Sequence, residues 1–146
     1  ILQLQITNKF MSILTLYLNR IMQWLEKNRP DYGASFLPGL SDAEIRKKLA
    51  NVELELPEEI YELYRWKNGV EDGEDFNTLV PSPIIDISFH LELKSIYRNL
   101  MTMMQTLAEY LETGTHYLDN DGFLDGDEEK MLPIFQKYNP GFDLIV

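Results

Sequence analysis

The residues best suited to chemistry form an acidic stretch near the C-terminus, YLDNDGFLDGDEE at positions 117–129, in which six of thirteen residues are Asp or Glu. Carboxylates spaced around a glycine are typical of the twelve-residue calcium loop of EF-hand proteins. With Tyr117 at the first position of that loop, Gly122 falls at the sixth, where a sharp turn requires glycine. The candidate calcium ligands are then Asp119, Asp121, Asp125 and Glu128.

Two features argue against a complete calcium site. The first ligand is missing, because the phenol of Tyr117 cannot replace a carboxylate around a hard cation. The segment after the loop carries Pro133 and is predicted to be a strand, whereas an EF-hand continues into a helix. We therefore expect no metal site of high affinity, and the alternatives are weak calcium binding and a solvated acidic turn.

Candidates for catalysis are few. The chain has no cysteine and two histidines, and it lacks a glycine-rich phosphate loop, a G-x-S-x-G motif and an H-E-x-x-H motif. His90 is expected on the polar face of a strand and His116 in a loop, and a general base also requires a partner that orients it. We expect neither an enzyme nor a bound cofactor.

The charge of the chain is strongly negative and unevenly distributed. Its net charge is −11, from 24 acidic and 13 basic side chains. Residues 1–50 carry seven basic and four acidic side chains, whereas the remainder carries six basic and twenty acidic ones. Such a surface repels nucleic-acid phosphates and anionic membranes and attracts basic proteins. The alternative is that the charge serves solubility alone.

Length and composition are typical of one globular domain covering residues 1–146, with 45% hydrophobic and 12% aromatic residues. The absence of cysteine suits a reducing cytoplasm, which is the expected location. The apolar run near the start has no small-residue cleavage site and is too short to cross a bilayer. Because the first residue is Ile, we expect the domain to be either truncated or preceded by a non-native remnant.

Hydrophobic periodicity and capping residues predict an α+β fold in which helices pack around a small mixed or antiparallel sheet. Apolar residues at three- and four-residue spacing indicate helices at 12–28 and 93–112. Ser41 and Glu44 form a capping box that begins a helix at 42–50. The remaining predicted elements are a helix at 57–68 and strands at 84–91, 131–136 and 142–146.

The apolar faces of these elements also predict the core. Its expected members are Leu18, Ile21, Ile45, Leu49, Ile60, Leu63, Tyr64, Ile87, Phe89, Leu100, Leu107 and Ile134.

Residues 37–69, LPGLSDAEIRKKLANVELELPEEIYELYRWKNG, resemble the SUKH superfamily, which includes the yeast Smi-Knr cell-wall regulators. The shared features are a Gly-Leu-Ser helix start, a Leu-Pro pair followed by acidic residues, an aliphatic-Tyr-x-Leu-Tyr run and a closing Asn-Gly. The resemblance implies an α+β fold and a non-catalytic binding role. Many bacterial relatives are immunity proteins that neutralise polymorphic or contact-dependent toxins, often nucleases, and the fungal ones act as signalling scaffolds.

We therefore expect a protein-binding module, most similar to a bacterial immunity protein, whose partner is a protein such as a basic toxin or nuclease and not nucleic acid or a membrane. The alternatives are a regulatory scaffold of the Smi-Knr type and a calcium-binding protein. Tyr61 and Trp66 are the candidate binding hot spots if either is exposed, although a lone Trp on this face of the helix favours packing against a neighbouring element. The carboxylates expected to attract the partner are Glu71, Asp72, Glu74, Asp75, Asp125 and Asp127.

Overall fold

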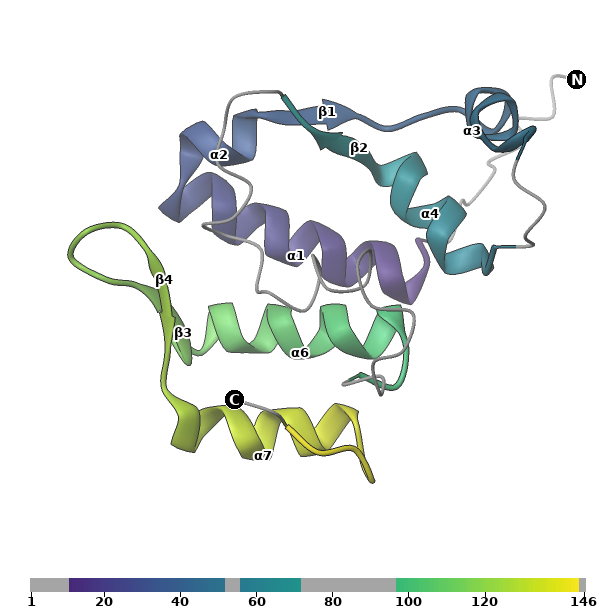
Figure 1. Ribbon diagram of the computed structural model, residues 1–146. Coiled ribbons are helices and arrows are strands. Elements are labelled where there is room, and N and C mark those ends of the chain that lie inside the picture. Colours follow the sequence, from purple (N-terminus) through teal and green to yellow (C-terminus); the bar gives the residue numbers. More distant parts are fainter. Residues whose placement is uncertain (1–10, 52–55, 72–96, 145–146) are drawn as a thin grey trace, which may run out of the picture.

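The computed structural model describes residues 11–51, 56–71 and 97–144 (Figure 1). It consists of helices and two small antiparallel sheets, β1–β2 and β3–β4, which confirms the predicted α+β class. In chain order the elements are α1 (Ile13–Asn28), α2 (Pro30–Ala34), β1 (Phe36–Pro38), α3 (Asp42–Leu49), α4 (Glu58–Trp66), β2 (Lys67–Val70), α6 (Leu100–Glu112), β3 (His116–Leu118), β4 (Leu124–Gly126) and α7 (Glu128–Tyr138).

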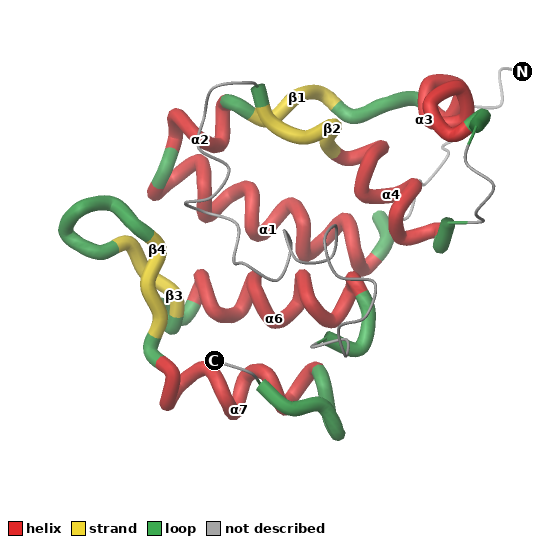
Figure 2. The backbone as a smooth tube through the Cα atoms, viewed as in Figure 1, coloured by secondary structure: helices red, strands yellow, loops and turns green. Residues whose placement is uncertain are grey.

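Helix α6 lies between α1 and α7, and these three helices form successive layers (Figures 1 and 2). Helix α4 and the β1–β2 ribbon cover the other side of α1. Burial of the facing apolar side chains supplies the main driving force for this packing. The cluster of buried residues between α1, α2 and α6 is Leu14, Leu18, Ile21, Leu25, Tyr32, Met103, Met104, Ala108 and Leu111.

The opposite face of α6 packs on α7 through both apolar and polar contacts. The Tyr110 hydroxyl donates to the carbonyl oxygen of Met131 at 3.1 Å. The rings of Tyr97 and Phe135 lie 5.5 Å apart, and Phe135 is fully buried. Helix α6 is therefore covered on two sides.

Asn139, which follows α7 and is fully buried, links three segments. Its side-chain amide donates to Thr106 Oγ1 at 3.0 Å and to the Phe135 carbonyl at 3.2 Å. Its Oδ1 accepts from the backbone amide of Arg98 at 3.1 Å. Buried polar groups of this kind are costly to leave unpaired, so Asn139 fixes the position of α7 on α6.

The helices predicted at 12–28 and 42–50 are confirmed as α1 and α3, and Ser41 and Glu44 form the expected capping box. The helix predicted at 57–68 ends at Trp66, because Lys67 is extended and residues 67–70 pair with β1 as β2. The helix predicted at 93–112 begins at Leu100, where Asn99 is the N-cap, so residues 97–99 are not helical and residues 93–96 lie outside the described residues.

The strand predicted at 131–136 is wrong, because these residues lie within α7. Asp127 caps this helix by accepting from the Lys130 amide, and Pro133 is accommodated in its second turn. The apolar residues at 131, 134, 135 and 138 in fact have helical spacing. Residues 142–144 are not in a strand, and the predicted strand at 84–91 lies outside the described residues.

The predicted core is correct for Leu18, Ile21 and Ile45, which are buried. Tyr64 is wrong: it is 42% exposed, because the face of α4 that carries Glu62 and Trp66 turns toward α1 instead. Among the other predicted members, Leu63, Leu100 and Leu107 are partly buried against the main cluster, Leu49, Ile60 and Ile134 are half-buried, and Ile87 and Phe89 lie outside the described residues. None of the helices in the described ranges is long and apolar enough to span a membrane.

Replacing Asn139 with Ala should lower the free energy of unfolding by about 2 kcal/mol, because it leaves buried groups of the α6–α7 contact without partners. Urea denaturation measures the effect. The control is Asn28→Ala, which removes an exposed amide bonded to the Trp24 carbonyl and should cost less than about 0.5 kcal/mol. Equal effects of the two variants would contradict the structural role of Asn139.

Candidate functional site

The acidic stretch forms a β-hairpin between α6 and α7, and we call residues 116–129 the acidic hairpin. Strand β3 pairs with β4 in antiparallel register, with His116 opposite Gly126 and Tyr117 opposite Asp125. The burial pattern alternates along β3, so that His116 is buried and Tyr117 is exposed. The stretch therefore has a defined structure, which the sequence interpretation as a solvated turn did not foresee.

The tip of the hairpin is held by its own hydrogen bonds. One carboxylate oxygen of Asp119 accepts from the backbone amides of Asp121 and Phe123, at 2.9 and 2.8 Å. The Asp119 amide donates to the Phe123 carbonyl, and Gly122 adopts a positive φ of 84° that favours glycine. Arg29 donates to the Gly122 carbonyl at 2.8 Å, which ties the tip to the end of α1.

This arrangement differs from a calcium loop. Helices α6 and α7 do flank the stretch, so the expectation that no helix follows it is wrong. The paired strands β3 and β4, however, enclose the turn, whereas the two helices of an EF-hand flank the calcium loop directly. Asp119 faces its own backbone, and Asp125 accepts from the Gly126 amide and the Tyr117 hydroxyl. Asp121 is exposed, and Glu128 opens α7. Within the described ranges, no group of three or more His, Asp or Glu side chains is placed to hold a metal ion.

The base of the hairpin is fixed against α6 and α7 by His116. Its ring packs on the Tyr110 ring with centroids 4.6 Å apart, and the side chain is buried, which corrects the expectation of a loop histidine. A Cβ atom at Gly126 would lie 2.9 Å from His116 Cδ2 and 3.2 Å from Met131 Sδ. Any other residue at this crossing would force the His116 ring or the Met131 side chain to shift.

Burial also determines the charge of His116. Desolvation lowers the pKa of the imidazole below its ordinary value of 6.5, and the nearby Asp125 carboxylate opposes this only in part. Among the described residues, no hydrogen-bond partner is present for the buried Nδ1 atom. His116 is therefore neutral at pH 7, and its role is to pack the base of the hairpin on α6.

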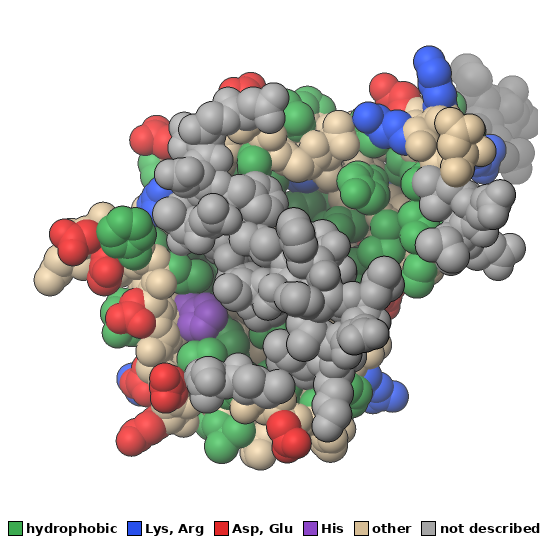
Figure 3. Space-filling view, viewed as in Figure 1, with side chains coloured by type: hydrophobic (Ala, Val, Ile, Leu, Met, Phe, Trp, Pro, Cys, Tyr) green, Lys and Arg blue, Asp and Glu red, His purple; other side chains and the backbone are tan. Residues whose placement is uncertain are grey.

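The outer surface of the hairpin combines exposed aromatic rings with carboxylates. Phe123 is 54% exposed and Tyr117 is 42% exposed. Figure 3 shows acidic side chains gathered over the hairpin and the start of α7, with hydrophobic ones among them. Sequence reasoning missed both aromatic residues as binding candidates, although the alternation of His116, Tyr117 and Leu118 was a signal that Tyr117 points outward. The carboxylates of this surface are Asp119, Asp121, Asp125, Asp127, Glu128 and Glu129.

The other predicted partner residues lie elsewhere. Trp66 is half-buried, donates from Nε1 to Asn19 Oδ1 at 2.9 Å and packs 6.0 Å from the Phe36 ring, so it joins α4 to α1 and β1. Glu71 is exposed just after β2. Asp72, Glu74 and Asp75 lie outside the described residues.

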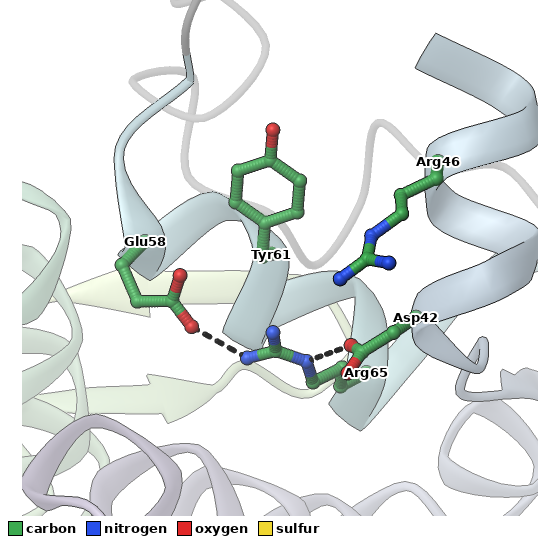
Figure 4. A pocket seen from close by; sticks show the side chains of 5 residues that line it. All are labelled: Asp42, Arg46, Glu58, Tyr61 and Arg65. Carbon is green, nitrogen blue, oxygen red and sulfur yellow. Dashed lines mark hydrogen bonds and ion pairs between the residues drawn. The ribbon is translucent and has the colours of Figure 1, made fainter. Parts of the chain in front are cut away.

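Tyr61 lines a cleft of about 270 Å³ between α3 and α4 (Figure 4). The two helices are brought together at Gly39, where a Cβ atom would lie 1.7 Å from the Arg65 carbonyl oxygen. The Leu40 amide donates to the Tyr64 carbonyl at 2.9 Å and fixes the chain just before α3. The lining residues are Asp42, Arg46, Glu58, Tyr61 and Arg65.

Helices α3 and α4, whose residues line the cleft, and the acidic hairpin lie at opposite ends of the molecule (Figure 1). The fold therefore does not bring Tyr61 together with Asp125 and Asp127, although all three were predicted to serve one partner surface. Helix α3, beside the cleft, carries Arg46, Lys47 and Lys48 in its last turn. The two ends of the molecule therefore differ in charge as well as in position.

Comparisons with protein-family models, curated proteins and solved structures found no significant match to this chain.

The buried, neutral His116 should make stability depend on pH. As the pH falls below about 6.5, the unfolded chain binds a proton at this residue before the folded protein does, so the free energy of unfolding decreases. His116→Phe should remove this component, giving a smaller decrease between about pH 7.5 and 5.5 in urea denaturation. Tyr110 and Asp125, which face the imidazole, are unchanged in the variant. If the free energy of unfolding changes equally with pH in the wild type and in the His116→Phe variant, His116 is not the residue responsible.

Proposed function

We propose that this protein is a non-catalytic protein-binding module and that the acidic hairpin binds a basic protein partner. The observation that carries the proposal is the exposure of Phe123 and Tyr117 among the carboxylates of one fixed hairpin. Aromatic side chains that become buried on binding supply much of the affinity of protein interfaces. Surrounding charges raise the association rate and select partners of opposite charge.

The rigidity of the hairpin supports this role. Asp119 holds the tip, Arg29 ties it to α1, and His116 packs the base on α6. A surface that is already ordered loses little conformational entropy when a partner binds. The hairpin thus suits a preformed interface for a folded partner.

The resemblance of residues 37–69 to the SUKH superfamily supports a more specific proposal. In this proposal the protein is an immunity protein that acts in the cytoplasm, and the partner is a basic toxin such as a nuclease. A regulatory scaffold of the Smi-Knr type is the alternative, in which the same hairpin binds a basic segment of a signalling protein. The negative charge of −11 disfavours nucleic acid as a direct ligand of either.

Surface plasmon resonance against the protein encoded beside this one tests the immunity proposal. Phe123→Ala should raise the dissociation rate about thirtyfold, the equivalent of about 2 kcal/mol. Asp121→Asn combined with Glu128→Gln should mainly lower the association rate, and added salt should lower it further.

Matched controls lie at the other end of the molecule. Ile13→Ala removes a side chain that is 59% exposed near the start of α1, and Glu59→Gln removes a charge from α4. Neither should change the binding kinetics. If no neighbouring protein binds, or if the hairpin variants behave like the controls, the immunity proposal fails.

A further inference from the structure

We propose that the cleft between α3 and α4 is a second binding site, which takes an Asp or Glu side chain from an acidic segment of a partner protein. The site is separate from the acidic hairpin and has the opposite charge preference. It is formed by Arg46, Tyr61 and Arg65 together with two carboxylates, in a cleft of about 270 Å³ (Figure 4).

Arg65 forms a fixed wall of the cleft. Its Nε donates to Asp42 Oδ1 at 2.5 Å and its Nη1 donates to Glu58 Oε1 at 2.7 Å, so it links the start of α3 to the start of α4. The two carboxylates take up two of the five N–H donors of this guanidinium and favour one orientation of it. The remaining groups of the cleft are therefore presented on an ordered frame.

Arg46 and Tyr61 are the groups available to a ligand. Within the described part of the chain, neither the Arg46 guanidinium nor the Tyr61 hydroxyl has a hydrogen-bond or ion-pair partner, whereas Arg65 has two. Figure 4 shows the Arg46 guanidinium directed into the space between the helices, on the side of Tyr61. A guanidinium binds a carboxylate through two parallel hydrogen bonds, and the Tyr61 ring, whose hydroxyl points away from the Arg46 guanidinium in Figure 4, forms a wall beside it.

The size and charge of the cleft define the ligand. At about 270 Å³ it falls below the usual range for cofactor and drug-sized pockets, but it can hold one side chain. The two arginines and the two carboxylates of the lining cancel in formal charge. A doubly charged phosphate feels twice the attraction to the arginines but also twice the repulsion from Asp42 and Glu58, so its charge gives it no advantage, whereas a planar carboxylate matches the two parallel N–H donors of Arg46.

Lys47 provides a matched control for Arg46. Both are exposed basic residues in the last turn of α3, so their removal changes the net charge and the field of the helix equally. Only Arg46 lines the cleft. If the Arg46 variant loses more affinity for an acidic peptide than the Lys47 variant does, the loss is due to binding in the cleft. General attraction between the basic end of the protein and the peptide would affect both variants equally.

The experiment is an NMR titration of the full chain with a short, terminally blocked peptide that contains two glutamates. The amide shifts of α3 and α4 should change and saturate, with a dissociation constant on the order of 1 mM. Arg46→Gln should weaken binding about tenfold, whereas Lys47→Gln should change it less than twofold. Tyr61→Phe should change it much less than Arg46→Gln does, because the hydroxyl points away from the guanidinium and the ring is kept.

Two further titrations distinguish the ligand chemistry. The same peptide with glutamine in place of glutamate should cause no saturating shifts, and inorganic phosphate should bind more weakly than the glutamate peptide. The proposal is overturned if the glutamate peptide causes no shifts in α3 and α4, if Arg46→Gln and Lys47→Gln lose equal affinity, or if phosphate binds more tightly.

Discussion

The fold depends on the burial of α6 on two sides. One side is apolar, whereas the other carries polar groups that need hydrogen-bond partners. One side presents Met103, Ala108 and Leu111 to α1, where loss of water contact is enough to drive packing. The other side carries Thr106 and Tyr110, whose polar atoms need partners once buried. Asn139 donates to Thr106, and the Met131 carbonyl accepts from Tyr110. These two hydrogen bonds fix the position of α7 relative to α6.

The acidic hairpin follows from this constraint. Figure 1 shows it at the turn between α6 and α7, so the two helices fix both of its ends. His116 and Gly126 fill the space where the strands leave the helices, which turns Tyr117 and Asp125 outward. The carboxylates cost little stability there because they remain in water. The layer of helices thus presents a charged, aromatic surface without placing charge in its interior.

Local signals in the sequence predicted α1, α3 and most of α4, because capping residues and apolar periodicity depend on residues that are close in the chain, but they missed α2 and α7. The strand assigned to 131–136 failed because Pro133 was weighed above the helical spacing of the apolar residues around it. The site was harder to predict, because exposure is a tertiary property. The packing of Trp66 was favoured from the sequence and is confirmed. The sequence does not say that Phe123 is exposed or that Arg46 and Tyr61 line the same cleft.

Native-state hydrogen exchange tests most directly whether the acidic hairpin is a preformed surface carried by the helices. We expect the amides of Phe123 and Asp127, which donate to Asp119 Oδ1 and to the Thr115 carbonyl, to be protected at least about a hundredfold over an unstructured peptide. The most protected amides should lie in α6. Exchange of the two hairpin amides at the rate of an unstructured peptide, with α6 still protected, would contradict a preformed binding surface.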